Sequence, residues 1–233
     1  LVGNRRLYIL NTGVGPNGVE IERIYDTKDG LFDCSWSEVN ENQTVTASGF
    51  SNKKMEKHQR EVFSVYWNLI KKDSFVSGSW DHTIRLWRPE VPQSLSIFSE
   101  HTAYVYSTIW SPYNPYVFGS ASSDNTFKVW DVKIPRSAQT IRAHSNEILS
   151  LDWNKYQENV IVTGLSDRTV KVWGLRFPDR EVTCLHERQY AIRRVKCSPY
   201  DGNIIASASY DMTVRLWNTT LIDPLMMHIL NLF

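Results

Sequence analysis

One eleven-residue pattern occurs four times in the last two thirds of this 233-residue chain. Each copy begins with a hydroxyl residue, has an Asp four residues later and ends in a Trp six residues after the Asp. The terminal tryptophans recur at a nearly constant interval of about 43 residues. A fixed period of this length indicates a repeat architecture in which each period supplies one structural unit. The copies contain Ser77, Asp81 and Trp87; Ser120, Asp124 and Trp130; Thr163, Asp167 and Trp173; and Ser207, Asp211 and Trp217.

A histidine series runs in phase with these motifs. His58, His101 and His144 each precede a terminal Trp by the same interval, whereas the last repeat has Arg188 at that place. An apolar run of strand length follows each position. Together, the two series are typical of a WD-repeat β-propeller, in which four-stranded blades surround a central channel. We therefore predict an all-β fold in which the apolar runs form the innermost strands of the blades. These runs are 62–67, 105–110, 148–153 and 192–197.

The chain is long enough for about five blades, some of them partial, in a single propeller domain spanning 1–233. One blade is shortened, because Trp67 follows Trp36 much sooner than one repeat length and no Asp-x-Thr-x-x-x-Trp motif lies between them. We expect an unpaired sheet edge there, and a ring that cannot close because truncation at both ends and an internal deletion remove strands of a seven-bladed parent. The predicted divisions are a partial blade 1–28, a shortened blade 29–57, regular repeats at about 58–100, 101–143, 144–187 and 188–220, and a tail 221–233 that adds one outer strand.

The recurring His, hydroxyl and Asp residues also suit nucleophilic catalysis, in which a histidine activates a hydroxyl group. The set recurs with every repeat, however, and an enzyme requires one such site rather than four. In WD repeats the indole N–H donates, the hydroxyl donates and accepts, and the carboxylate accepts, which forms a hydrogen-bonded chain inside each blade. We assign the sets to structure and expect no enzymatic activity, cofactor or metal. Because Arg188 replaces the histidine, the last blade is expected to lack the full chain.

Composition excludes several classes of protein. A net charge of +1 provides no basic field for a phosphate backbone, so nucleic acid is not expected as a partner. The cysteines Cys34, Cys184 and Cys197 stand at unrelated spacings, which argues against a disulfide framework and favours a reducing intracellular compartment. No apolar run reaches the roughly 18 residues needed to span a bilayer.

One face of the predicted ring is rich in aromatic residues. In a propeller, the segment before each inner strand and the residue before each repeat Asp lie on the same face. An amphipathic helix with a basic end would find there an apolar groove and a carboxylate, and aromatic residues are common hot spots of interfaces. The alternative, in which Phe63 and its counterparts Phe32 and Leu149 only fill the mouth of the channel, stays open. The candidate ligand-binding residues are Trp80, Tyr104, Tyr106, Tyr210, Glu61, Glu147, Phe63 and Arg193.

The segments between the motifs resemble one family. Residues 29–36, 105–112, 147–153, 190–196 and 209–217 are similar to the peroxisomal type-2 targeting-signal receptors, the seventh peroxin, with Tyr190-Ala-Ile-Arg-Arg-Val195 the most specific stretch. The shortened blade, Arg188 and the tail from Leu221 depart from the family. The resemblance implies a cytoplasmic, non-catalytic, monomeric receptor that cycles to the peroxisome. It would bind matrix proteins through an amino-terminal amphipathic helix with a basic start, together with a co-receptor and docking proteins.

The alternative function is that of a substrate-receptor or scaffold subunit of a ubiquitin ligase or another multiprotein complex. Ligase adaptors of this fold often carry Trp-Asp-x-Arg after a repeat. Here Trp130-Asp-Val-Lys133 ends in Lys, and Trp173-Gly-Leu-Arg176 lacks the Asp. The sequence therefore favours the import receptor.

Overall fold

The computed structural model describes residues 2–3, 6–12, 19–26, 31–36, 44–48, 58–143, 145–186, 190–221 and 224–229. All elements in these ranges are β-strands, arranged in six antiparallel sheets. The predicted roles of His144 and Arg188 fall outside the described residues.

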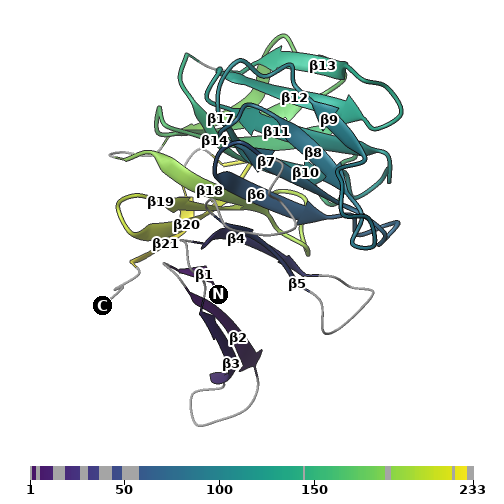
Figure 1. Cartoon of the computed structure of the whole chain (residues 1–233). Helices are drawn as coiled ribbons and strands as arrows, with labels where there is room; N and C mark the ends of the chain where they lie inside the picture. Colours follow the sequence, from purple (N-terminus) through teal and green to yellow (C-terminus); the bar gives the residue numbers. More distant parts are fainter. Residues whose placement is uncertain are drawn as a thin grey trace.

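Four regular four-stranded sheets make up most of the molecule and lie side by side (Figure 1). Within each sheet the strands pair in chain order, from the innermost strand outward. The predicted inner strands have the expected bounds, which confirms the all-β propeller. The sheets are β6 (Val62–Trp67), β7 (Phe75–Ser79), β8 (Ile84–Trp87) and β9 (Ser96–Phe98); β10 (Val105–Trp110), β11 (Val117–Ser122), β12 (Thr126–Asp131) and β13 (Ser137–Arg142); β14 (Ile148–Trp153), β15 (Val160–Leu165), β16 (Thr169–Gly174) and β17 (Glu181–His186); and β18 (Ile192–Cys197), β19 (Ile204–Ser209), β20 (Thr213–Asn218) and β21 (Pro224–Ile229).

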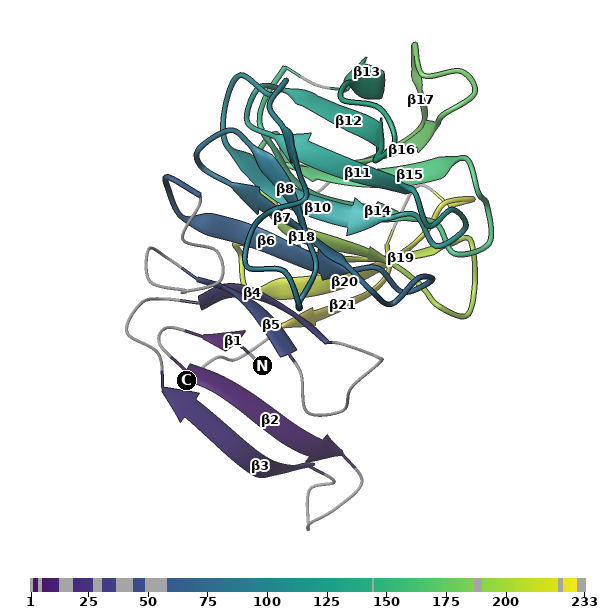
Figure 2. The same ribbon diagram turned by 45° about the vertical axis from the view of Figure 1, so that its right-hand side comes forward.

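The amino-terminal part forms two smaller sheets. The shortened blade consists of β4 (Leu31–Trp36) and β5 (Thr44–Ser48), and within the described ranges β5 pairs only with β4. A three-stranded sheet contains β1 (Val2–Gly3), β2 (Arg6–Thr12) and β3 (Val19–Asp26), and its β2–β3 ribbon extends away from the regular sheets (Figure 2). The segment predicted to be a tail contributes β21, which pairs with β20.

The inner strands β4, β6, β10, β14 and β18 surround one channel. Side-chain oxygens of one inner strand accept backbone N–H groups of the next: Ser35 Oγ from Trp67 at 2.8 Å, and Asp152 Oδ2 from Cys197 at 2.8 Å. Arg194 Nη2 of β18 lies 3.5 Å from Asp33 Oδ1 of β4, so one ion pair links the last regular sheet to the shortened one at the channel. The open ring stays a prediction.

Apolar side chains fill the space between neighbouring blades. Phe118 and Trp130 of one blade stack at 6.0 Å between centroids and are fully buried, and they pack against Phe98 of the preceding blade. Small residues let the sheets approach: a Cβ on Gly164 would lie 2.7 Å from Val195 Cγ1 and 2.9 Å from Ile192 Cγ2. Strands so closely packed hold the channel and both faces of the ring in a fixed shape.

This close packing predicts that Gly164→Ala destabilises the protein. The added methyl group overlaps two branched side chains of β18, and overpacking of this kind costs about 1–3 kcal/mol. Chemical denaturation measures the change. Gly174→Ala is the matched control, since its nearest contact would be the exposed Val182 at 3.5 Å, and it should change stability far less. Equal effects of both substitutions would contradict the packing argument.

The repeat residues form a directed hydrogen-bond chain. In the first regular blade Trp87 Nε1 donates to Ser77 Oγ at 2.8 Å, Ser77 Oγ lies 2.7 Å from His58 Nε2, and His58 Nδ1 lies 2.8 Å from Asp81 Oδ2. A neutral His satisfies every group, because Nδ1–H donates to the carboxylate and Nε2 accepts from the Ser hydroxyl.

The second regular blade repeats this chain. Trp130 Nε1 donates to Ser120 Oγ at 2.8 Å, and Ser120 Oγ lies 2.7 Å from His101 Nε2. His101 Nδ1 lies 2.7 Å from Asp124 Oδ2. The sequence repeat is therefore also a repeat of hydrogen-bond geometry in these two blades.

In the other two blades, the described residues include the Trp-to-hydroxyl bond of this hydrogen-bond chain. Trp173 Nε1 donates to Thr163 Oγ1 and Trp217 Nε1 to Ser207 Oγ, both at 2.9 Å. Asp167 Oδ1 accepts the N–H of Thr169 at 3.0 Å. In the last blade, Arg215 Nη2 lies 3.0 Å from Asp211 Oδ2, so a guanidinium faces the carboxylate that a histidine faces in the first two regular blades. The expected effect of Arg188 lies outside the described residues and stays a prediction.

Because these hydrogen-bond chains are buried, we predict that the protein loses stability in acid. Burial lowers the pKa of His58. Burial alone would raise the pKa of Asp81, but hydrogen bonds from His58 and Thr83 outweigh it and lower that pKa. Both pKa values are lower in the folded than in the unfolded protein, so the folded state binds fewer protons. The stabilisation is therefore complete above about pH 6.5, the ordinary value for His, and declines as pH falls.

Urea unfolding at a series of pH values tests this expectation. The free energy of unfolding should fall from pH 7 to pH 5 and fall further once unfolded carboxyl groups protonate below about pH 4. The control is His82→Asn, which removes a histidine that is not part of the hydrogen-bond chain. Asn tolerates the left-handed conformation at φ 69°, and the variant should show the same dependence of unfolding free energy on pH as the parent. Constant stability down to pH 5 would show that the histidine is not held neutral.

Candidate functional site

Aromatic rings form a continuous ladder across one face of the ring of blades. Phe32 stacks on Phe63 at 4.2 Å between centroids, Phe63 on Trp80 at 4.6 Å, and Trp80 on Tyr104 at 4.9 Å. Tyr106 meets Phe63 edge-on at 5.8 Å. We call these five residues the aromatic face. They come from β4, β6, β10 and the loops beside them, so the face joins three blades.

Local hydrogen bonds fix the loops that carry these rings. Trp80 N donates to Glu61 O at 2.9 Å, which ties the turn after β7 to the segment before β6. The same bond recurs as Ser123 N to Tyr104 O, also at 2.9 Å, and as Tyr210 N to Ala191 O at 3.1 Å. The residue before each repeat Asp therefore lies beside the residue that precedes an inner strand. That geometry explains how positions separated by two strands of a blade contribute to one surface.

Charged residues adjoin the aromatic face at Tyr106. Burial, followed by the charge of Glu147, raises the pKa of the Tyr106 phenol to about 12, while Arg193 acts in the opposite direction. Burial also lowers the pKa of Arg193, which interacts with Tyr210 and Tyr106. The phenol of Tyr106 stays protonated at neutral pH and remains a hydrogen-bond donor. A carboxylate, a guanidinium and two phenols thus lie at one edge of the ladder.

The candidate residues differ in how they meet solvent. Tyr210 is 57% exposed and Glu147 is exposed, whereas Phe63 is buried at 8%. Trp80 does not project freely outward as the motif position suggested. It is half-buried between two rings, and its Nε1 is buried with no hydrogen-bond partner among the described residues. Glu61 is partly exposed beside it.

Two residues outside the predicted binding set also belong to this surface. Phe32, which the sequence placed at the channel mouth, forms one end of the ladder and is 37% exposed. His82 packs edge-on against Tyr104 at 5.6 Å. His82 follows the repeat Asp and has a positive φ of 69°, as Asn125, Arg168 and Met212 do in the other blades. The position directly after the repeat Asp is the sequence signal that could have identified His82.

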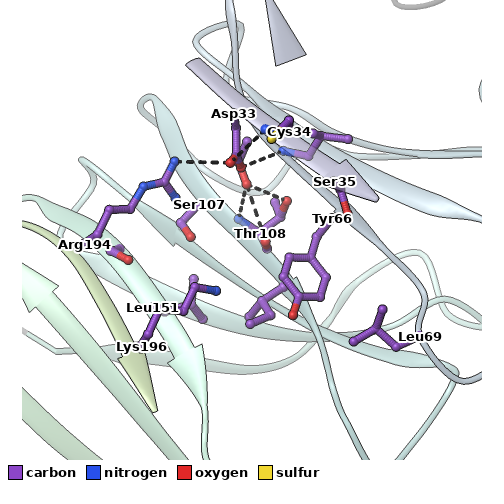
Figure 3. A pocket seen from close by; sticks show the side chains of 14 residues that line it. Asp33, Cys34, Ser35, Tyr66, Leu69, Ser107, Thr108, Leu151, Arg194 and Lys196 are labelled. Carbon is purple, nitrogen blue, oxygen red and sulfur yellow. Dashed lines mark hydrogen bonds and ion pairs between the residues drawn. The ribbon is translucent and has the colours of Figure 1, made fainter. Parts of the chain in front are cut away.

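The channel beneath the face contains charged side chains as well as apolar ones. A cavity of about 470 Å³ is lined by residues of all five inner strands, and Figure 3 shows Asp33, Arg194 and Lys196 around it. Burial raises the pKa of Asp33 even though Arg194 lies 3.5 Å away. Lys196 Nζ lies 3.7 Å from the buried Asp152. Both cations of the lining are therefore already paired with carboxylates of neighbouring strands.

The apparent catalytic sets are inaccessible. His58, Ser77 and Asp81 have the contacts of a Ser-His-Asp triad, but Ser77 is 0% exposed and its oxygen accepts the indole N–H of Trp87. No substrate can reach that hydroxyl. The aromatic face, by contrast, offers accessible apolar area flanked by Glu61 and Glu147, a combination that suits a helix with a basic end.

The known proteins similar to this chain agree with its architecture. The model of the WD domain, G-beta repeat family matches residues 49–88, 92–131, 135–174 and 180–218. The "Peroxisomal targeting signal 2 receptor" of Dictyostelium discoideum is 58% identical over 94% of this chain and 73% of the relative. The human protein of that name is 51% identical over 90% of this chain and 69% of its own length. "Peroxisome biogenesis protein 7" of Arabidopsis thaliana is 39% identical over 41% of this chain and 35% of the relative.

These matches and the sheets described above define a WD-repeat β-propeller. Within that class, the identity to relatives over most of the chain places it in a narrower group. The chain belongs to the family of peroxisomal targeting signal 2 receptors. The resemblance inferred from the segments between the motifs is confirmed. Among the described residues, no helix is long and apolar enough to cross a membrane.

Proposed function

We propose that this protein is a non-catalytic import receptor that binds the amino-terminal type-2 targeting signal of peroxisomal matrix proteins on its aromatic face. In this account it works as a monomer in the cytoplasm, delivers its cargo with a co-receptor to docking proteins at the peroxisome, and returns. The names of its relatives support the receptor role. The continuous ladder from Phe32 to Tyr104 is the structural observation that carries the choice of face.

The face suits the chemistry of such a signal. An amphipathic helix presents one apolar stripe, and rings stacked at 4.2–4.9 Å offer a continuous apolar strip on which that stripe can lie. Glu61 and Glu147 flank the strip and can meet a basic residue at the start of the helix. Apolar burial supplies most of the affinity, because an exposed ion pair contributes only about 0–1 kcal/mol.

Co-purification separates this function from that of a ubiquitin-ligase subunit. Tagged protein isolated from cytosol should carry peroxisomal matrix proteins with a type-2 signal, and blocking that signal by an amino-terminal fusion on the cargo should release them. Recovery of ligase subunits without matrix proteins would support the alternative and contradict the receptor proposal.

The exposed carboxylate predicts an electrostatic effect on binding. Glu147→Lys should slow association of a type-2 signal peptide and weaken its affinity up to about fivefold at low salt, because steering charges act mainly on the association rate. The difference should shrink at high salt as screening shortens the range of the charge. Stopped-flow fluorescence at two ionic strengths measures it. Glu158→Lys, an exposed charge reversal in the turn at the other end of the blade's strands, is the matched control. If both variants behave alike, Glu147 has no part in the site.

A further inference from the structure

The opposite face of the propeller carries its own repeated set of exposed apolar side chains. Each regular blade has a turn after its inner strand, at the strand end remote from the aromatic face. The third residue of that turn is Ile70, Tyr113, Tyr156 or Tyr200, with exposed fractions of 42%, 38%, 55% and 87%. We call these four residues the distal face. Exposed aromatic side chains held on one surface are candidates for interaction hot spots.

The four turns share one construction. The first residue of each turn accepts two backbone N–H groups with its side chain. Asn68 Oδ1 accepts from Ile70 and Lys71, at 3.1 and 3.0 Å. Ser111 Oγ and Asn154 Oδ1 do the same for Tyr113 and Tyr156, and Ser198 Oγ does so for Tyr200 at 3.0 Å. These hydrogen bonds therefore fix the backbone that carries the exposed apolar residue in each of the four turns.

Neighbouring turns are also tied to each other. Asn68 Nδ2 donates to Pro115 O of the next blade at 2.9 Å, and Asn154 Nδ2 donates to Gly202 O at 2.7 Å. Tyr156 Oη donates to Pro199 O at 2.8 Å, which holds its ring against the turn that carries Tyr200. A surface fixed in this way loses little conformational entropy on binding, which favours affinity.

Two lysines on this face favour a ligand that carries a negative charge. Lys71 Nζ lies 4.3 Å and Lys133 Nζ 3.9 Å from the centroid of the Tyr116 ring, so two ammonium groups share one aromatic side chain. Among the described residues, no ion pair joins either lysine to a carboxylate. By contrast, nearby Asp73 is already paired with Arg88 at 3.1 Å. Lys71 follows Ile70 in the same turn, and the two cations meet at Tyr116, where they complement an acidic group.

We propose that the distal face and the Lys71–Tyr116–Lys133 cluster form a second docking surface, which binds an acidic protein segment that also carries aromatic or aliphatic side chains. The apolar side chains of the segment lie against Ile70, Tyr113, Tyr156 and Tyr200, and a carboxylate lies between the two lysines. A membrane with anionic lipids fits less well, because its diffuse negative surface would also meet the exposed Glu90, Glu158 and Asp201, whereas a segment can place its carboxylate at the lysine pair alone. This surface is independent of the proposed signal site.

Peptide binding to the full chain tests the proposal. The probes are short fluorescent peptides in which Phe or Leu alternates with Glu or Asp, and matched peptides with Lys in place of the acidic residues. Titration by fluorescence anisotropy should give saturable binding of the acidic set at least about tenfold tighter than that of the basic set. Vesicles of phosphatidylcholine and phosphatidylserine serve as the membrane probe in sedimentation.

Variants then locate the binding. Tyr200→Ser should weaken acidic-peptide binding at least about tenfold if this residue is a hot spot, and Lys71→Glu with Lys133→Glu should weaken it in a salt-sensitive way. Arg142→Glu with Arg168→Glu, exposed positions near the other face, makes the same change in net charge and should have little effect. Tyr210→Ser should leave acidic-peptide binding unchanged.

These experiments test the distal-face proposal independently of the proposed signal site. Binding of a type-2 signal peptide should be unaffected by the distal-face variants, so loss of both activities would mean a folding defect and melting curves of each variant would reveal it. Equal binding of acidic and basic peptides, binding that survives Tyr200→Ser and the double lysine reversal in folded protein, or binding to anionic vesicles but not to peptides would overturn the proposal.

Discussion

Replacing Asp124 with alanine is expected to lower the free energy of unfolding by about 3 kcal/mol, the largest effect on stability that we predict. Asp124 Oδ2 accepts from His101 Nδ1 at 2.7 Å and from Thr102 N at 3.1 Å, and Oδ1 accepts from Thr126 N at 3.0 Å. The substitution leaves His101 Nδ1–H without its acceptor, and the His101 side chain is only 1% exposed. Water cannot replace the lost acceptor there.

Urea denaturation of Asp124→Ala measures this loss. Asp179→Ala is the control, because Asp179 is an exposed carboxylate and its removal should change stability by no more than about 0.5 kcal/mol. Binding of a type-2 signal peptide should persist in the folded fraction of the variant. A variant that melts like the parent but loses the peptide would move Asp124 from the structural chain to the binding site.

Replacing Trp80 with alanine is expected to weaken binding of a type-2 signal peptide by about 2 kcal/mol or more, which is about thirtyfold. The indole lies between Phe63 at 4.6 Å and Tyr104 at 4.9 Å, so its removal interrupts the ladder in the middle. Peptide titration by fluorescence anisotropy measures the loss.

The half-buried position of Trp80 calls for a second variant. Trp80→Phe keeps an aromatic ring in the stack and should recover most of the affinity, whereas Trp80→Leu keeps apolar volume without the stacking and should recover less. Melting curves show whether each variant is folded. If folded Trp80→Ala binds the peptide as tightly as the parent does, the aromatic face is not the signal site.

The repeat motifs were sufficient to predict the regular blades. Each combines a period-2 apolar run, a turn and a Trp at a fixed interval, so local pattern and long-range period agree. The hydrogen-bond chain was predicted for the same reason, because His58, Ser77, Asp81 and Trp87 have recurring counterparts. The Asp33–Arg194 ion pair was not predicted, since it joins residues far apart in the chain that share no motif.

The sequence predicted which loop positions converge, but not how each side chain there packs. The positions before the inner strands and before each Asp do converge, because Trp80 N and Tyr210 N bond to the segments ahead of β6 and β18. Whether an aromatic residue there projects or stacks depends on its neighbours, which the motif does not specify. Trp80 is clamped by two rings, while Tyr210 is 57% exposed.

Titration of a fluorescent type-2 signal peptide into the protein, with co-receptor present, tests the receptor function most directly. We expect saturable binding to the parent protein. A peptide whose apolar stripe is scrambled should bind at least about tenfold more weakly. A folded Trp80→Ala and Glu147→Lys double variant should show strongly reduced binding of the intact peptide. Unchanged affinity in the double variant would place the site elsewhere on the propeller. Equal binding of the scrambled peptide, or no binding of any type-2 signal to the intact parent, would contradict the receptor function itself.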